Sequence, residues 1–206
     1  VGCWGFFYGL MGKEKLEKHW RYLIARYGAL PVTWCAAGEV KMPFYLEEDR
    51  ETAAQQQREA WTDLLRFIRE TDPYRRPVTA HPGGGSASQR EIADVSVLDY
   101  DMLQAGHGDR NREMSIELVR ESVGLEKRMP VINAEVGYEG IAAGNHREYQ
   151  VYFFWASVLS GAGGHSYGAN GIWQLNRPDE PYGASPHGGC WGGYPWPEAA
   201  RLHGAQ

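Results

Sequence analysis

Two glutamates close short apolar segments of the kind that form buried strands. Glu39 ends the segment 31–39, and Glu135 ends the segment 130–135. A carboxylate is costly to remove from water, so two such placements in one chain indicate that the charges take part in chemistry. A carboxylate pair hydrolyses glycosidic bonds with retention at a separation of about 5 to 5.5 Å and with inversion at about 6.5 to 9.5 Å. The alternative for either glutamate is a structural salt bridge.

Other polar side chains fall at or just beyond the remaining expected strand ends. They are His81, Asp99, Asp101, Gln104, His107, His165 and Tyr167. On rigid strand ends, such side chains can bind sugar hydroxyls and orient the two glutamates. Satisfied structural polar contacts are the alternative for each position.

Two aromatic residues are further candidates for contact with a sugar. Tyr138 follows Glu135 by three residues and can hydrogen-bond to it or stack on a substrate, or simply pack in its loop. Trp173 follows the last expected strand, where it can serve as a sugar platform or cap the fold. Trp34 has the opposite strand parity to Glu39, so we expect it to point toward the helices.

A metal site is the main rival for the histidines and aspartates, because these residues are also ligands in metal-dependent hydrolases. No His-x-His or His-Glu-x-x-His pair is present in the sequence. We therefore expect no metal and no cofactor.

Apolar segments alternate with amphipathic ones along the chain. Helices are expected over residues 14–27, 52–70, 112–125, 147–160 and 197–206, and the helix over 147–160 is expected to be buried on more than one side. Strands are expected over residues 1–7, 31–39, 77–81, 95–103, 130–135 and 163–167. The glycine-rich tract 83–88 is expected to be a loop.

This alternation predicts an α/β fold in which helices cover a mainly parallel sheet. Six strands fit a doubly wound sheet, but chemistry at successive strand ends favours a (β/α)8 TIM barrel, which typically needs about 250 residues. The chain has 206 residues, so we expect one domain (1–206) with about six of the eight βα units, lacking the first two. Glu39 then ends the fourth strand and Glu135 the seventh. The interval 135 − 39 = 96 residues gives about 32 per unit, close to the roughly 30 expected.

Composition excludes several classes of partner. A net charge of −5 without a basic stripe argues against nucleic acid. No segment reaches the roughly 18 consecutive apolar residues of a membrane span. Three scattered cysteines, Cys3, Cys35 and Cys190, do not form a disulfide framework or a zinc knuckle. Eight Trp and twelve Tyr, many in glycine-rich segments, suit a carbohydrate as the partner, because sugars stack on flat aromatic faces.

Six short motifs then point to a family. They are RYGA (26–29), WCAAGE (34–39), TAHP (79–82), QAGH (104–107), NAEVGYEG (133–140) and GHSYGANGIWQ (164–174). In this order they resemble the apiosidase-like family of (β/α)8 glycoside hydrolases. The resemblance implies Glu39 as general acid/base and Glu135 as nucleophile, with plant-type polysaccharide side chains as substrates and a secreted or periplasmic location. Gly38 is a departure, because the wider clan usually has an Asn there that contacts the sugar 2-hydroxyl.

These observations favour a retaining glycosidase that acts on an oligo- or polysaccharide, with no nucleic acid and no membrane as partner. Two alternatives from other classes stay open. One is a carbohydrate-binding barrel without turnover, and the other is a metal-dependent hydrolase.

Overall fold

The computed structural model describes residues 5–108, 111–126, 128–141, 145–182 and 193–205. The long helices are α1 (Phe6–Tyr27), α2 (Arg50–Thr71), α4 (Asn111–Gly124) and α5 (Arg147–Leu159). Shorter helical turns are η1 (Met42–Leu46), α3 (Ser88–Glu91), η2 (Val95–Val97) and α6 (Trp196–Ala199). The strands are β1 (Trp34–Cys35), β2 (Val78–Thr79), β3 (Ser86–Ala87), β4 (Asp101–Gln104), β5 (Val131–Glu135) and β6 (Gly164–His165).

The parallel strands form two groups that follow one another in chain order. β1 pairs with β2, and β4 pairs with β5, which pairs with β6. The amide of Asp99, just before β4, donates to the carbonyl of Val78 in β2 at 2.9 Å and joins the two groups. β3 is a short antiparallel addition to β4. The described residues thus form part of a parallel α/β sheet, and they do not close it into a barrel.

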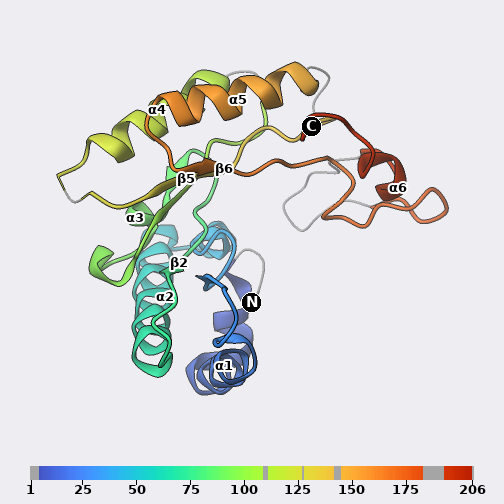
Figure 1. The fold of residues 1–206 in the computed structure, drawn as a ribbon. Helices are drawn as coiled ribbons and strands as arrows, with labels where there is room; N and C mark the ends of the chain where they lie inside the picture. Colours follow the sequence, from blue (N-terminus) through green and yellow to red (C-terminus); the bar gives the residue numbers. More distant parts are fainter. Residues whose placement is uncertain (1–4, 109–110, 127, 142–144, 183–192, 206) are drawn as a thin grey trace.

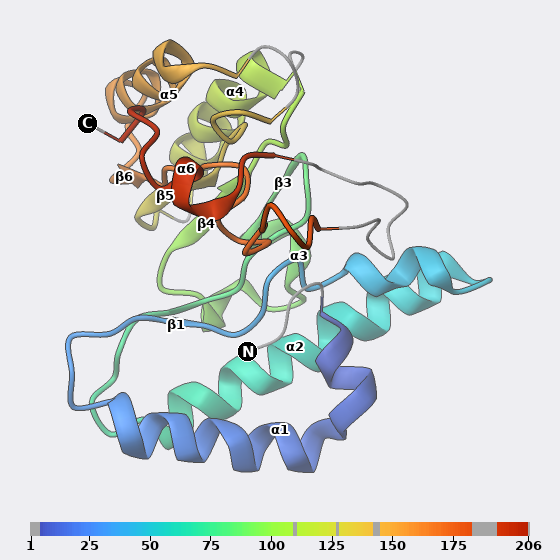
Figure 2. The ribbon, with the colours of Figure 1, turned by 90° about the vertical axis from the view of Figure 1, so that its right-hand side faces the viewer.

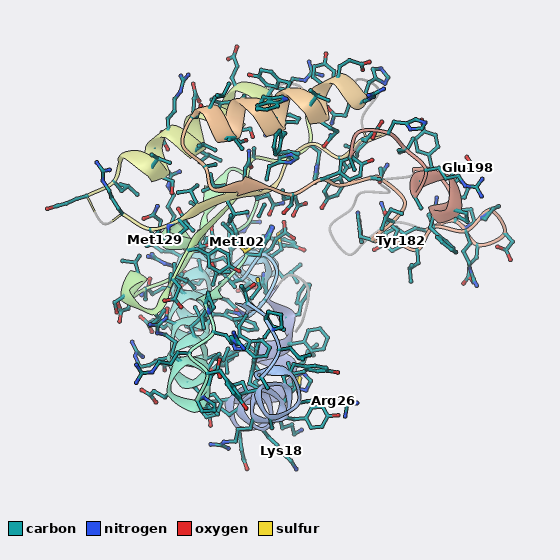
Figure 3. All side chains as sticks on the ribbon, in the orientation of Figure 1. Lys18, Arg26, Met102, Met129, Tyr182 and Glu198 are labelled. Atoms are coloured by element: carbon teal, nitrogen blue, oxygen red, sulfur yellow. The ribbon has the colours of Figure 1, made fainter. Side chains whose placement is uncertain are left out.

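The first core lies between α1, α2 and the strands β1 and β2 (Figure 1). Helix α1 contributes Leu16, Trp20 and Ile24, which recur at helical spacing on one face. The opposite face of α1 carries exposed charges such as Lys18 and Arg26, which point away from the sheet in Figure 3. Trp34 points toward these helices as its parity predicts, and its indole nitrogen donates to Asp72 at 2.8 Å.

The second core lies where α4 and α5 cover β4, β5 and β6, on the other side of the molecule from α1 and α2 (Figures 1 and 2). Leu103, Leu118, Val119 and Val131 are buried there. Asn133 of β5, also fully buried, ties the sheet to both helices through Ser115 of α4 and Ser157 of α5.

Two of the expected strands and the expected glycine-rich loop need correction, although all four expected long helices form. Phe6 and Phe7 begin α1 instead of ending a strand, and residues 1–4 lie outside the described residues. In the segment 95–103, Asp94 caps the turn η2 through Ser96, so the strand begins only at Asp101. The glycine-rich tract 83–88 is not all loop, since it contains β3.

Two expectations about helices were also wrong. Helix α5 is buried on one face only, through Gln150, Phe153 and Ser157, while Trp155 and Leu159 are 56% and 80% exposed. The C-terminal helix α6 ends at Ala199, well before residue 206. No helix in the described part of the chain is both long and apolar enough to span a membrane.

Candidate active site

A bulge in β5 determines where the side chain of Glu135 points. Leu103 of β4 pairs with Asn133, but the next residue, Gln104, pairs with Glu135, so Ala134 has no partner. Without this extra residue Glu135 would share the parity of Asn133, whose side chain faces the helices. The bulge turns Glu135 to the face of Gln104, away from the second core, as bulges near sites commonly do.

Glu39 lies in an unusual backbone conformation at the end of the β1 segment. Its φ is 50°, in the left-handed region that residues other than glycine rarely adopt. The surrounding backbone holds it there: the His81 amide donates to the Ala37 carbonyl at 2.9 Å, and the Val40 amide donates to the His81 carbonyl at 3.2 Å. Strain of this kind costs of order 1 to 3 kcal/mol and clusters at functional sites.

Three side chains surround the carboxylate of Glu135, which is 17% exposed. His81 Nε2 lies 3.3 Å from Oε2, His107 Nε2 lies 3.2 Å from Oε1, and the Tyr138 hydroxyl also donates to Oε1. Burial alone acts to raise the pKa of Glu135. The hydrogen bond from His107, the charge of His81 and the hydrogen bond from Tyr138 outweigh it, so the pKa is lowered. Glu135 is therefore ionised at neutral pH.

Glu39 has the opposite electrostatic environment. Burial, as the main cause, raises the pKa of Glu39 to about 7, and the negative charge of Glu135 acts in the same direction. The amide of Gln104 donates to Glu39 Oε1 at 3.1 Å and opposes this rise. Near neutral pH Glu39 can therefore both hold and release a proton.

The titrations of the two carboxyl groups are coupled, because the charge of Glu135 raises the pKa of Glu39. Gln104 is related to both of them, because it donates to Glu39 and is the ladder partner of Glu135. Two carboxyl groups whose environments separate their pKa values can divide the roles of proton donor and anionic nucleophile. The structure thus brings together six of the residues expected from the sequence, which are Glu39, Glu135, His81, Gln104, His107 and Tyr138.

Asp101 lies elsewhere, which corrects its expected place beside the sugar. Its side chain is fully buried on the helix side of the sheet and accepts hydrogen bonds from the backbone and side chain of Gln89 and from Ser122. Asp99 likewise has structural partners, Arg69 at 2.5 Å and the Val78 amide at 2.9 Å.

The remaining expected residues do not contact either glutamate through a hydrogen bond or ion pair in the described structure. His165 pairs with Asn133 and packs its ring 6.2 Å from that of Phe154 in α5. The Tyr167 hydroxyl donates to Glu139 at 2.6 Å. The ring of Trp173, 41% exposed, packs edge-on against Tyr182 at 5.2 Å.

Two residues near the site were missed by the sequence interpretation. Glu139 is only 6% exposed and accepts hydrogen bonds from Tyr167 and from the Gly204 amide, which tie the C-terminal segment to the end of β5. Gly168 lies against Tyr138, where an added Cβ would be 2.2 Å from a ring carbon. Glu139 is part of the NAEVGYEG segment, but nothing in the spacing distinguishes it from a solvated loop residue.

Within the described residues, no group of three or more His, Cys, Asp or Glu side chains is arranged to hold a metal ion. His81 and His107 instead approach different oxygens of one carboxylate.

Comparison with known proteins identifies the class of protein to which this fold and site correspond. The sequence model of the apiosidase-like catalytic domain matches residues 2–206. The chain therefore belongs to the apiosidase-like family. No curated protein sequence matches the chain significantly.

Solved structures agree with the family. A structure described as a glycoside hydrolase superposes with a TM-score of 0.73 at 25% identity, covering 98% of this chain and 46% of that one. A glycoside hydrolase family 5 protein from Bacteroides vulgatus ATCC 8482 gives a TM-score of 0.70 at 27% identity, covering 96% of this chain and 43% of that one. The chain thus spans less than half the length of these two proteins.

Proposed function

We propose that this chain carries the catalytic residues of a retaining glycoside hydrolase, with Glu135 as nucleophile and Glu39 as general acid/base. The observation that carries the proposal is that Gln104 donates to Glu39 at 3.1 Å and is the ladder partner of Glu135, so both carboxyl groups lie on one side of the sheet. The opposite shifts of the two pKa values, up to about 7 for Glu39 and down for Glu135, agree with separate roles. A retaining enzyme needs one carboxyl group protonated and the other ionised before the reaction starts.

In the first step Glu135 forms a bond to the anomeric carbon while the glycosidic C–O bond breaks. Glu39 delivers its proton to the departing oxygen, so the leaving group departs as a neutral alcohol and Glu39 becomes a carboxylate. In the second step Glu39 takes a proton from water, the water oxygen bonds to the anomeric carbon, and Glu135 is released. Both carboxyl groups return to their initial states.

The fold we propose for this function is an arc of a (β/α)8 barrel. Two groups of parallel strands in chain order, each covered by helices, are the arrangement expected of consecutive βα units in that architecture. Glu39 and Glu135 both follow or end strands at their carboxyl ends, which is where barrel enzymes place their catalytic groups.

The substrate class follows from the family, and we propose a carbohydrate. The family description names an apiosidase, so an apioside is the first glycoside to test. A panel of aryl glycosides and oligosaccharides widens the search.

The test compares Glu135→Gln, Glu39→Gln and the exposed control Glu117→Gln from α4 on a responsive glycoside. Glu135→Gln should abolish turnover and Glu117→Gln should leave it unchanged. Glu39→Gln should reduce turnover by about 10² to 10⁴-fold for a poor leaving group and far less for a nitrophenolate, which needs no proton.

The anomer of the first product, read by proton NMR, decides the stereochemistry. Retention is the expected result, and inversion would replace the nucleophile role of Glu135 by that of a general base. Near-normal turnover by Glu135→Gln would overturn the assignment altogether. Unchanged sugar affinity in both variants without any product would favour a binding protein.

A further inference from the structure

Asn145 connects the segment that follows β4 with the segment that follows β5. It lies just before α5 and is only 3% exposed. Its side-chain nitrogen Nδ2 donates to the carbonyl oxygen of His107 at 2.9 Å, and its backbone carbonyl accepts from the amide of Gly140 at 2.8 Å. A buried, hydrogen-bonded residue that bridges two segments in this way holds them rigidly against each other.

Gly137 makes the close approach of Asn145 possible. A Cβ atom added to Gly137 would lie 2.5 Å from Nδ2 of Asn145, which is too close for two nonbonded atoms. The carbonyl of Gly137 in turn accepts from Nε2 of Gln150 in α5 at 2.6 Å. Because Gly137 directly precedes Tyr138, these contacts hold the backbone from which the tyrosine ring extends.

The two connected segments carry the two side chains that approach Oε1 of Glu135. His107 Nε2 lies 3.2 Å from this oxygen, and the Tyr138 hydroxyl donates to it. The two rings also contact each other, with their centroids 4.4 Å apart. Because His107 and Tyr138 belong to different segments, their meeting at one oxygen depends on how these segments are held relative to each other.

We propose that Asn145 is a positioning residue that holds His107 and Tyr138 together at Oε1 of Glu135. It acts through the backbone of His107 and through the segment 137–140, which carries the tyrosine. The effect on catalysis rests on the proposed function, whereas the arrangement of the side chains around Glu135 does not.

Loss of this link should be visible in the titration of Glu135. Burial acts to raise the pKa of Glu135, and the contacts that lower it below its ordinary value are the hydrogen bond from His107, the charge of His81 and the hydrogen bond from Tyr138. A variant without the Asn145 side chain allows His107 and Tyr138 to move away from the carboxylate. The pKa of Glu135 should therefore rise.

Two other titratable groups interact with Glu135 from different parts of the sheet. His81 Nε2 lies 3.3 Å from Oε2, and the charge of Glu135 raises the pKa of Glu39. Neither His81 nor Glu39 forms a hydrogen bond or an ion pair with Asn145 in the described structure. A change in the titration of Glu135 on substitution of Asn145 should therefore arise at Oε1.

The first measurement is the ¹³C NMR titration of the Glu135 carboxyl group, assigned by the absence of its signal in Glu135→Gln. Asn145→Ala should move the midpoint to higher pH by about one unit. Gly137→Ala, whose added methyl group displaces the Asn145 side chain, should move it in the same direction. A wild-type midpoint in folded Asn145→Ala would overturn the proposal. This result does not depend on finding a substrate.

Asn176 provides a matched control for a purely structural role. It is 7% exposed, and its side chain donates to two backbone carbonyls at 3.1 Å and accepts from a backbone amide at 2.8 Å. Asn176→Ala should therefore lower the thermal stability without moving the titration midpoint of Glu135. A shift as large as that of Asn145→Ala would attribute the effect to general loosening and overturn the proposal.

The double variant separates steric overlap from the loss of the hydrogen bond. Gly137→Ala alone should be less stable because its methyl group overlaps Asn145, and much of this loss should disappear in Gly137→Ala/Asn145→Ala, where the overlap is removed. The titration midpoint of Glu135 should nevertheless stay raised, because the hydrogen bond to the His107 carbonyl is still absent. A return to the wild-type midpoint in the double variant would contradict the role of Asn145.

The second measurement is the pH dependence of kcat/KM on a responsive glycoside. With Glu135 as nucleophile, the acidic limb of Asn145→Ala should move to higher pH together with the NMR midpoint, and kcat should fall by up to about 10²-fold. A raised midpoint with an unmoved limb would refute the nucleophile role and leave the positioning role intact. An unmoved midpoint would refute the positioning role, whatever the kinetics.

Discussion

Gln104 and Glu135 face each other across the β4–β5 ladder only because Ala134 is accommodated as a bulge. The same Gln104 amide donates to Glu39 at 3.1 Å. Gln104 on β4 therefore connects both carboxyl groups. The register between β4 and β5 determines whether Glu135 lies on the same side of the sheet as Gln104 and Glu39. An ordinary ladder would have directed Glu135 toward α4 and α5, where Asn133 already points.

The basic limb of kcat/KM should reflect Glu39. Glu39 acts first as an acid, so activity should fall as the pH rises through its pKa of about 7. The hydrogen bond from Gln104 lowers this pKa, so Gln104→Leu should move the limb to higher pH. Gln56→Leu on the exposed face of α2 is the matched control. If the basic limb of Gln104→Leu stays at the wild-type pH, the hydrogen bond from Gln104 does not influence the pKa of Glu39.

Glu39 should also make the folded state less stable as the pH rises. Its pKa is raised from 4.5 to about 7 on folding, so between these values the folded state binds more protons than the unfolded state. Stability should therefore fall with increasing pH across this window, by about 3 kcal/mol at most from this group. Glu39→Gln removes the titration, so denaturant unfolding should show it more stable than the wild type at pH 8 and closer to it at pH 5. Equal differences at both pH values would mean that burial does not dominate at this position.

Gly168 should be essential for the position of Tyr138. An alanine Cβ there would lie 2.2 Å from the Tyr138 ring, and relief of this overlap moves the hydroxyl away from Glu135. Gly168→Ala should lose about 1 to 3 kcal/mol of stability and much of its activity. Gly163→Ala places its Cβ at an ordinary 3.7 Å from the Val131 carbonyl and should be close to neutral. Thermal unfolding and kcat measured on both variants test the difference.

Much of the site follows from the sequence because the relevant signals are local. The apolar segment that ends in Glu135 predicted its place at the end of β5, whereas β1 ends at Cys35, before Glu39. Helical spacing of Leu16, Trp20 and Ile24 predicted the packing of α1. The bulge at Ala134 could not be predicted, since nothing in that segment favours an extra residue over a regular ladder.

The side of the sheet on which Asp101 lies follows from strand parity, although we expected Asp101 beside the sugar. Asp101 and Gln104 are three residues apart on one strand, so their side chains must face opposite sides of a regular sheet. Because Gln104 faces the glutamates, Asp101 has to share the helix side with Leu103. His165 is more difficult to place from sequence, since its side follows from its pairing with Asn133, a contact between distant parts of the chain.

Asp101→Ala provides the test of this correction. The buried carboxylate accepts three hydrogen bonds, two from Gln89 and one from Ser122, and its removal leaves these donors unsatisfied. Each buried unsatisfied group costs about 1 to 3 kcal/mol, so the midpoint of thermal unfolding should fall clearly. The folded fraction should keep the KM and the pH profile of the wild type, because the Asp101 side chain contacts Gln89 and Ser122 and neither glutamate. A raised KM with unchanged thermal stability would instead return Asp101 to the sugar-binding residues.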